Sequence, residues 1–270
     1  MQIGSKRFEI GRRTFVVGIV NVTPDSFFDG GSYTTVEGAV LRAKKIAADG
    51  ADIIEIGGES SRPGFTPVAA DVELGRVIPV LQALKKEIEL PIAVDTYKAE
   101  VAQAALQNGA SLINDIFGFK KDPELAKVCA RLGAACCVMH NRDNTDYGNF
   151  LLDVIADLQE GANILISAGV SPQNIILDPG IGFAKSAAQN LEVIRNLPMF
   201  SALPYPVMLG TSRKSFIGKT LGLPTEERLE ATLATSVLAV SAGCAFVRVH
   251  DVLENKRAVM MADEIIRHRH

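Results

Sequence analysis

The stretch Gly18-Ile-Val-Asn-Val-Thr-Pro-Asp-Ser-Phe-Phe-Asp-Gly-Gly31 decides the fold. It continues an almost wholly apolar, β-branched run, Phe15 to Val20, which predicts a buried strand. At Asn21 this run gives way to a segment rich in turn formers. α/β proteins place their chemistry in such polar loops, just past the carboxyl ends of buried strands. One stretch of this kind is equally typical of an ordinary strand-to-helix loop, so its recurrence along the chain decides the interpretation.

The alternation of short apolar and longer amphipathic segments continues to the end of the chain. Eight predicted strands cover residues 15–20, 51–57, 91–96, 110–116, 134–139, 174–178, 206–210 and 245–249. Eight predicted helices cover residues 34–49, about 67–89, 98–108, 122–132, 149–168, 187–197, 226–242 and 252 to about 267. Ahead of them, Met1 to Phe15 alternates apolar with turn and charged residues, which predicts a small β-hairpin.

The repeated strand–helix unit predicts an α/β protein with a closed (β/α)8 TIM barrel, as a single domain over residues 1–270. We expect the N-terminal β-hairpin to lie outside the barrel wall and to pack at its bottom end. A doubly wound open sheet is the alternative. It is disfavoured because near-even units fit closure better, and because no Gly-x-Gly-x-x-Gly motif follows the first strand.

The composition is that of a soluble globular protein without a strongly basic surface. Of 270 residues, 47% are hydrophobic, and the formal net charge is −3. We therefore expect no nucleic-acid or membrane partner. No apolar run approaches the ~20 residues that span a bilayer, and Met1–Arg13 is too polar for a signal peptide. Four cysteines without metal-site spacing predict buried thiols in a reducing cytoplasm.

Polar residues follow the ends of all the predicted strands. They are Asn21, Glu59 with Ser61 and Arg62, Asp95, Asn114 with Asp115, His140, Asp178, Lys214, and Arg248 with His250. On a barrel they would form one ring around the top. Each also has an ordinary structural explanation: Asp95 as a helix cap, Arg248 in a pair with an acidic residue, and His250 as a cap of the last helix.

The cationic part of the ring predicts a phosphate site. Lys214, Arg248 and His250 belong to the seventh and eighth strands, whose loops commonly bind phosphate in barrels. Thr211–Phe216 adds hydroxyls and backbone N–H groups at the start of a short helix. On the other side, the carboxylates and amides can pair with the donors and acceptors of a polar heterocycle. The residues therefore predict a phosphorylated or diphosphorylated ligand with a heterocyclic end.

Four segments of the chain resemble the dihydropteroate synthase family. They are Asn21-Val-Thr-Pro-Asp-Ser-Phe27 with Asp29-Gly-Gly31, Gly58-Glu-Ser-Ser-Arg-Pro-Gly64, Asp178-Pro-Gly-Ile-Gly-Phe183 and Ser212-Arg-Lys-Ser-Phe216. The resemblance runs from the first strand to the last and implies a barrel enzyme of folate biosynthesis, usually dimeric and a target of sulfonamides. Such an enzyme joins 7,8-dihydropterin-6-ylmethyl diphosphate to 4-aminobenzoate, giving 7,8-dihydropteroate and pyrophosphate.

The resemblance also implies a role for each matching residue. The pterin ring would be held by Asp95, Asn114, Asp178 and Lys214. The diphosphate would be held by Asn21, Arg62, Arg248 and His250, with Asn21 also near a Mg²⁺ ion. The 4-aminobenzoate slot would be lined by Ser61, Pro63, Phe183 and Ser215, and Phe27 and Asp29 would belong to a closing loop. The catalytic residues would be Asp29, Asp95, Asp178 and Lys214.

The sequence departs from the family pattern at three places. Ser61 stands where many members have Thr, and Phe28 where many have Ser. After His140, the segment Asn141-Arg-Asp-Asn-Thr-Asp146 replaces a loop that more often contains Gly, Pro and Met, which leaves the role of this fifth loop unassigned. Two alternatives remain: a non-catalytic pterin-binding paralogue, and a pterin-dependent methyltransferase, which would have no use for the cationic residues.

Overall fold

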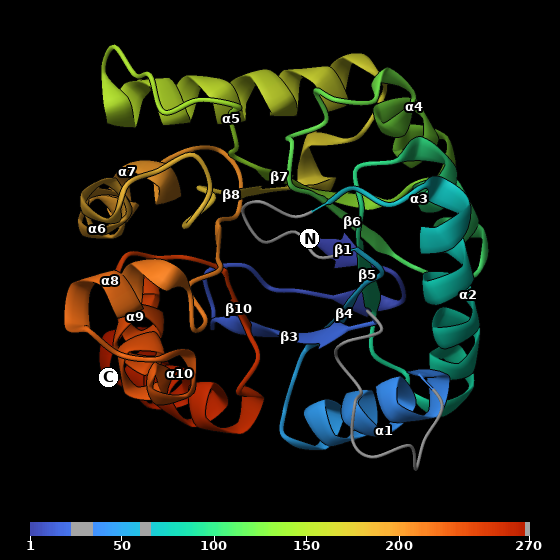
Figure 1. Cartoon of the computed structure of the whole chain (residues 1–270), viewed down its shortest axis with the longest axis horizontal. Helices are drawn as coiled ribbons and strands as arrows, with labels where there is room; N and C mark the ends of the chain where they lie inside the picture. Colours follow the sequence, from blue (N-terminus) through green and yellow to red (C-terminus); the bar gives the residue numbers. More distant parts are fainter. Residues whose placement is uncertain (23–34, 60–65, 268–270) are drawn as a thin grey trace.

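The structure is a computed structural model that describes residues 1–22, 35–59 and 66–267 (Figure 1). Its centre is a sheet of eight parallel strands in the order β8-β7-β6-β5-β4-β3-β10-β9. The two outermost strands, β8 (Ile175–Asp178) and β9 (Met208–Leu209), are joined by an isolated parallel bridge between Leu177 and Val207. The sheet is therefore a nearly closed barrel. The predicted TIM barrel is confirmed, and the open doubly wound sheet is wrong.

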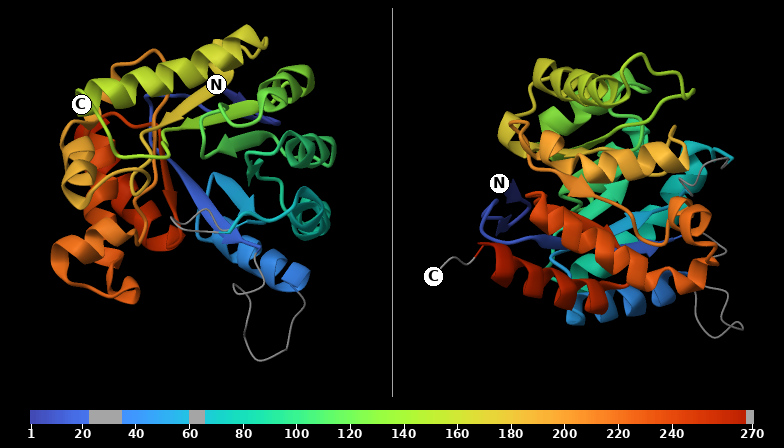
Figure 2. Two further views of the ribbon diagram at one scale, coloured as in Figure 1. Left: turned by 45° about the horizontal axis from the view of Figure 1, so that its top comes forward. Right: turned by 90° about the vertical axis from the view of Figure 1, so that its left-hand side faces the viewer.

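The predicted strands and helices are all present, within about three residues of their expected limits. The other barrel strands are β3 (Phe15–Asn21), β4 (Ile53–Gly57), β5 (Ile92–Asp95), β6 (Leu112–Asp115), β7 (Ala135–Met139) and β10 (Phe246–Val249). The helices that surround them (Figure 2) are α1 (Thr35–Ala48), α2 (Ala70–Glu87), α3 (Ala99–Gln107), α4 (Pro123–Leu132), α5 (Phe150–Ser167), α6 (Ala187–Arg195), α7 (Leu197–Ser201), α8 (Ser215–Leu221), α9 (Leu229–Ser241) and α10 (Val252–Arg267). In the described residues, no helix has the length and apolar character needed to cross a membrane.

Alternation along the strands divides the barrel interior into an apolar lower half and a polar upper half. Successive strand residues point to opposite faces. The inward-facing residues of the lower half form one buried cluster: Phe15, Val17, Ile53, Ala93, Leu112, Ala135, Cys137, Ile176, Met208 and Phe246. Two residues further along five of these strands stand Glu55, Asp95, Asn114, Asp178 and Arg248. Alternation along the strands therefore points these polar side chains into the barrel, above the apolar cluster.

The N-terminal hairpin closes the lower end of the barrel. It consists of β1 (Gln2–Ile3) and β2 (Lys6–Arg7), joined by a turn in which Gly4 has the left-handed φ of +57° that tight hairpins favour. Ile3 and Phe8 belong to the apolar cluster inside the barrel. The ring of Phe8 lies 4.9 Å from that of Phe15 and 5.9 Å from that of Phe246. The predicted position of the hairpin at the bottom is confirmed.

The cysteines behave as small core residues. Cys129, Cys136, Cys137 and Cys244 are all buried free thiols. They lie on β7, on α4 and just before β10, in the apolar layers on both sides of the barrel wall. This confirms the prediction that they are small buried core residues.

Phe8 provides a test of the hairpin as part of the core. Phe8→Ala should lower the free energy of unfolding by about 3–5 kcal/mol, because it removes a buried aromatic side chain and leaves a cavity. Urea denaturation measures this change. The matched control is Ile10→Ala, which truncates a side chain that is 39% exposed in the same segment. Equal effects of the two substitutions would show that the hairpin contributes no core packing.

Candidate functional site

Arg248 occupies the centre of the polar upper half. Its Nε donates to Oε1 of Glu55 at 2.6 Å, and its Nη2 donates to Oδ2 of Asp95 at 3.2 Å. Nη2 also contacts Glu55. Glu55 is buried on β4, and the side chain of Arg248 is 16% exposed. The guanidinium therefore bridges two carboxylates from neighbouring strands, β4 and β5.

Asp178 and Lys214 meet beside Arg248. The backbone N–H of Gly180 donates to Oδ1 of Asp178 at 2.8 Å, which fixes that carboxylate at the end of β8. A β-carbon built on Gly210 would lie 3.6 Å from Oδ2 of Asp178, 3.7 Å from Nζ of Lys214 and 3.7 Å from Cδ of Arg248. The three side chains thus border the same small space, which any side chain at Gly210 would enter.

Two buried acceptors of the cluster have no hydrogen-bond partner among the described residues. They are Oδ1 of Asn114 and Oε2 of Glu55. Buried polar atoms in native proteins are normally hydrogen-bonded, and an unpaired one costs about 1–3 kcal/mol. Asn114 is only 2% exposed. A buried acceptor of this kind, on the strand beside Asp95, fits a ligand that brings N–H donors.

Burial and charge pairing shift the protonation of the cluster. Burial, with the charge of Glu55 added, raises the pKa of Asp95 to about 7 against the opposing effect of Arg248. Burial also raises the pKa of Asp178, and Lys214 opposes this shift. Burial lowers the pKa of Lys214 to about 8, although Asp178 favours its charge. Burial disfavours the charge of Arg248 as well, but Glu55 and Asp95 together raise its pKa.

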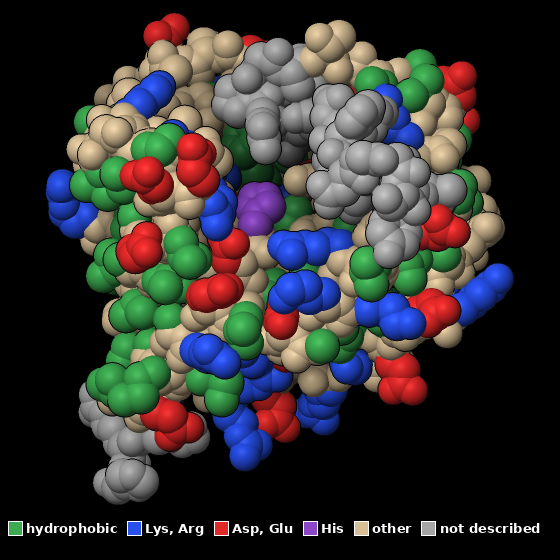
Figure 3. Space-filling view, turned by 60° about the horizontal axis from the view of Figure 1, so that its bottom comes forward, with side chains coloured by type: hydrophobic (Ala, Val, Ile, Leu, Met, Phe, Trp, Pro, Cys, Tyr) green, Lys and Arg blue, Asp and Glu red, His purple; other side chains and the backbone are tan. Residues whose placement is uncertain are grey.

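His250 lies on the other side of the site, beside the loop after β9. Its Nδ1 lies 2.9 Å from Oγ of Ser212, and its backbone N–H donates to the same oxygen at 3.2 Å. Of the two histidines that the structure describes, His140 is buried and His250 is partly exposed. Figure 3 shows a histidine at the edge of a hollow on this face, with Lys and Arg side chains beside it.

Arg213 shapes the same loop rather than facing the hollow. Its Nε and Nη2 donate to Asp251 at 2.7 and 2.9 Å, and its Nη1 donates to the backbone carbonyl oxygens of Thr225 and Glu226. This leaves Lys214 to turn inward just before α8, which begins at Ser215. Nζ of Lys214 donates to the carbonyl of Ile181 and lies 4.9 Å from the centre of the Phe183 ring.

The structure brings together five of the predicted site residues and separates others from them. Asp95, Asn114, Asp178, Lys214 and Arg248 form the buried cluster. Asn21 and Ser215 lie exposed at the ends of β3 and the β9 loop, and Phe183 is partly buried. Arg248 pairs with two acidic residues, Glu55 and Asp95, as the structural alternative for this residue predicted. Phe27, Phe28, Asp29, Ser61, Arg62 and Pro63 lie outside the described residues.

Three members of the predicted ring serve the scaffold instead. Glu59 accepts hydrogen bonds from the backbone N–H of Val68 and from Lys98, both at 2.7 Å. Asp115 accepts the backbone N–H groups of Phe117 and Phe119 at 2.8 and 2.7 Å. His140 is buried between Asp157 and Lys185. Polar residues at strand ends thus divide between those of the interior cluster and those that bind nearby loop backbone or side chains.

Sequence reasoning missed Glu55, the main partner of Arg248. The expectation considered residues at and just past the strand ends, whereas Glu55 lies in the middle of β4, between Ile54 and Ile56. The signal was present, because Glu55 shares the inward face with Ile53 by simple alternation. An acidic residue in the middle of a buried strand requires a partner, and this one is supplied by β10.

Comparisons with known proteins extend over nearly the whole chain. Residues 17–250 match the family model of pterin binding enzymes. The chain is 54% identical over 268 residues to the dihydropteroate synthase of Clostridium beijerinckii, which covers 99% of this chain and 100% of that protein. A crystal structure of the Clostridium difficile dihydropteroate synthase, in the presence of pteroic acid, has a TM-score of 0.94 at 47% identity and covers 97% of this chain and 100% of that one. The Xanthomonas albilineans enzyme with 4-aminobenzoic acid has a TM-score of 0.90 at 40% identity, covering 94% and 93%.

The shifted pKa of Asp95 predicts a pH-dependent free energy of unfolding. The pKa is about 7 in the folded protein, above the ordinary value of 3.8. Since the folded state binds this proton more tightly, Asp95 stabilises the protein at low pH, and the contribution is lost as pH rises through about 7. Asp95→Asn removes the titration. Urea denaturation between about pH 4 and about pH 8 should therefore show the parent losing stability relative to Asp95→Asn.

The control for this test is Asp143→Asn, which changes an exposed residue in the same way. Its stability difference from the parent should stay level across the same pH range. A difference between the parent and Asp95→Asn that is independent of pH would contradict the raised pKa.

Proposed function

Because this chain belongs to the dihydropteroate synthase family of pterin-binding enzymes, we propose that the polar upper half of its barrel binds a pterin diphosphate beside 4-aminobenzoate. The reaction is that of the family: 7,8-dihydropterin-6-ylmethyl diphosphate and 4-aminobenzoate give 7,8-dihydropteroate and pyrophosphate. The observation that supports this assignment best is the cluster of Asp95, Asp178 and Lys214, with the unpaired Oδ1 of Asn114 on the strand beside Asp95.

The pterin ring fits this cluster by its pattern of donors and acceptors. In the proposed complex, Asp95 and Asp178 accept N–H groups of the ring, and Asn114 accepts a further one through its unpaired oxygen. Lys214 donates to an acceptor of the ring. Carboxylates that accept N–H groups are stabilised in their charged form, so binding should draw Asp95 back toward ionisation.

The diphosphate is proposed to lie on the cationic side, against Arg62, Arg248 and His250. Arg248 lies on β10, and His250 directly follows the end of that strand at Val249. The pairing of Arg248 with Glu55 and Asp95 orients its guanidinium, and the acidic partners keep it charged. These groups would neutralise the negative charge that develops on the leaving pyrophosphate as its bond to the CH₂ group breaks.

A Mg²⁺ ion is compatible with the residues on this side. Mg²⁺ keeps several waters and is usually bound by one or two protein oxygens together with substrate phosphates. The exposed Asn21, at the end of β3, would supply one such oxygen. No group of three or more His, Cys, Asp or Glu that could hold a metal ion occurs among the described residues. When bound, the ion would add positive charge at the diphosphate.

The chemistry then requires little proton transfer from the protein. The C–O bond breaks with its electron pair going to pyrophosphate, and the CH₂ group becomes a cation conjugated with the pterin ring. Asp95 and Asp178 would stabilise this cation. The amine of 4-aminobenzoate, held along Ser61, Pro63, Phe183 and Ser215, attacks the CH₂ group and loses a proton. An aniline is neutral and nucleophilic at pH 7, so no strong general base is needed.

We propose that residues 1–270 form a single domain and that the protein is a cytoplasmic homodimer. An exposed apolar surface on α9 and α10 supports the dimer: Val237, Leu238, Met260, Met261 and Ile265 are 36–69% exposed. Figure 3 shows hydrophobic side chains gathered along the lower left of the molecule. Sedimentation equilibrium, with a chain mass of 28.9 kDa, and cell fractionation test these points.

The central prediction is pyrophosphate release that depends on 4-aminobenzoate. The purified protein, with 7,8-dihydropterin-6-ylmethyl diphosphate and Mg²⁺, should release pyrophosphate only after 4-aminobenzoate is added, and chelation of Mg²⁺ should stop the release. Coupled detection of pyrophosphate measures it. Pterin binding without release would indicate a non-catalytic paralogue, and transfer of a methyl group would indicate a methyltransferase.

Asp29 is proposed to act on the transition state. If its charge stabilises the developing pterin cation, Asp29→Asn should lower kcat about 10²-fold or more. The affinity for the pterin diphosphate, measured by calorimetry, should barely change, because an interaction made only in the transition state does not affect binding. The control is Asp71→Asn at the exposed start of α2. Near-normal turnover of a folded Asp29→Asn protein would assign Asp29 to an ordinary turn.

A further inference from the structure

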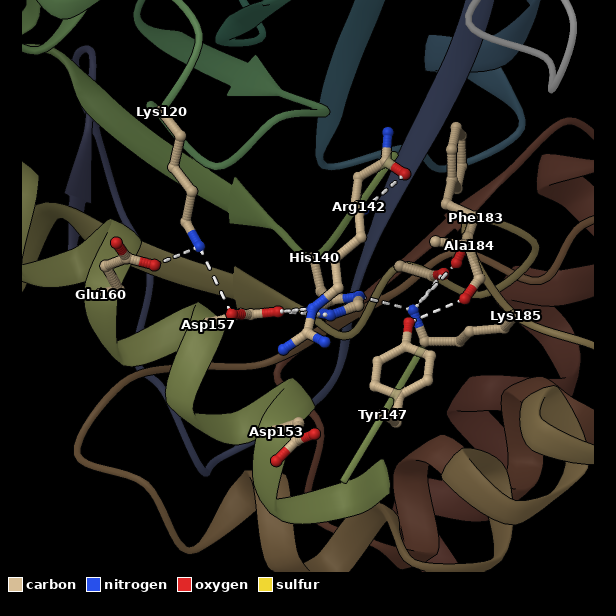
Figure 4. Close-up of polar contacts among 12 residues, drawn as sticks. Lys120, His140, Arg142, Tyr147, Asp153, Asp157, Glu160, Phe183, Ala184 and Lys185 are labelled. Atoms are coloured by element: carbon tan, nitrogen blue, oxygen red, sulfur yellow. Dashed lines mark hydrogen bonds and ion pairs between the residues drawn. The ribbon is translucent and has the colours of Figure 1, made fainter. Parts of the chain in front are cut away.

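Lys185 ends the loop of residues 179–185 that follows β8, and its ammonium lies against the inside of that loop. Nζ donates to the carbonyl oxygens of Gly180 and Phe183 at 3.0 and 3.1 Å, and to Nδ1 of His140 at 2.7 Å (Figure 4). Three acceptors therefore match the three protons of one ammonium. Two of them are backbone groups of the loop itself, so Lys185 is the internal anchor of this loop.

The loop needs such an anchor because its backbone is unusual. Gly180 and Gly182 have φ values of +67° and +88°, and Ala184 has a φ of +46°, which a residue with a side chain rarely adopts. Phe183 lies between the last two, and its ring faces Nζ of Lys214. The position of the Phe183 side chain therefore depends on holding a backbone path that the chain would not adopt unaided.

The third acceptor, His140, is a neutral imidazole with a defined tautomer. Since Lys185 donates to Nδ1, the ring proton is on Nε2, which lies 3.0 Å from Oδ2 of Asp157. Burial, with the nearby charge of Lys185 added, lowers the pKa of His140 to about 3. Asp157 on α5 thus orients the imidazole, and the imidazole orients the ammonium.

The unusual fifth loop, residues 141–148, joins this network at two points. Nε of Arg142 donates to the same oxygen of Asp157 at 2.5 Å, and its guanidinium lies 4.7 Å from the centre of the Tyr147 ring. The hydroxyl of Tyr147 donates to the carbonyl of Ala184 at 2.7 Å. The segment that departs from the family pattern therefore contacts the strained residue next to Phe183.

From this arrangement we propose that Lys185 is a positioning residue for 4-aminobenzoate: with His140 and the fifth loop, it holds the backbone of Phe183 so that the ring forms a wall of that subsite. The inference rests on the proposed function, in which Phe183 lines the subsite. It assigns the fifth loop a role in the binding of the second substrate.

The effect should be larger for 4-aminobenzoate than for the pterin diphosphate, because the hydrogen bonds that hold Asp178 do not involve the Lys185 side chain. The backbone N–H of Gly180 fixes the Asp178 carboxylate, and the backbone N–H of His140 donates to the carbonyl of Asp178 at 2.9 Å. Gly180 is itself pressed against the backbone of His140: a β-carbon there would lie 1.9 Å from the His140 carbonyl oxygen. Loss of the ammonium would therefore free the Phe183 end of the loop before the Asp178 end.

The test compares Lys185→Met with the parent protein in three measurements. Burial lowers the pKa of Lys185 to about 7, although Asp178 favours its charge, so the assays are run at about pH 6. The KM for 4-aminobenzoate should rise about tenfold, the factor expected for loss of one charge-assisted hydrogen bond. The Kd for the pterin diphosphate should stay within about twofold. Amide hydrogen exchange of residues 179–185 should become faster.

The matched control is Lys120→Met, which removes an ammonium from the outer end of the same network. Lys120 pairs with Asp157 at 3.5 Å and with Glu160. Its substitution should leave the 4-aminobenzoate KM within about twofold of the parent value. Tyr147→Phe is a milder second variant, since it removes one hydroxyl, and should raise that KM about threefold.

The outcomes separate the inference from the proposed function. An unchanged 4-aminobenzoate KM in folded Lys185→Met, or an equal loss of affinity for both substrates, would overturn the positioning role. So would unchanged hydrogen exchange of residues 179–185, whatever the activity. A parent protein that releases no pyrophosphate with 4-aminobenzoate would reject the proposed function, and the exchange measurement would still decide whether Lys185 anchors the loop.

Discussion

The site depends on one cation held between two acids inside a barrel. Arg248 pairs with Glu55 and Asp95 where water is scarce, and a buried charge is tolerated there only with close partners. Asp178 adds a third acid and Lys214 a second cation, so acids outnumber bases in this cluster. Burial, with the charge of Glu55 added, raises the pKa of Asp95 in this cluster. A ligand rich in N–H donors would offset the excess of acidic groups, which is why we propose that a pterin binds here.

The two halves of the barrel interior serve different ends. Below, Phe8, Phe15 and Phe246 pack with the apolar residues of the strands and close the interior to water. Above them, polar side chains on the same inward face lie two residues further along their strands. The lower half contributes stability through burial of apolar surface. The upper half lacks this contribution because it holds polar and charged side chains instead, the kind of groups that barrels use at their top face for binding and catalysis.

Much of the fold was predictable because its determinants are local. Strand runs, helical spacing and turn formers located the eight barrel strands and the main helix after each of them. Pro198 explains why the chain restarts as α7 after the sixth of these helices, α6. Pairings between distant residues were not predictable: Arg248 and Glu55 are 193 positions apart, and their contact follows from strand order and register. Nor could residue type alone separate Asp115, which binds the backbone N–H groups of its own turn, from Asn114, whose oxygen stays unpaired. Asp29 and residues 61–63 lie outside the described residues.

The N-terminal hairpin has a consequence for the order in which the molecule can be completed. Phe8 packs on Phe246, and β3 pairs with β10, which comes far later in the sequence. These contacts cannot form until β10 has been synthesised. During translation the hairpin and one edge of β3 therefore lack their partners until β10 is made, and closure of the barrel is a late event in folding.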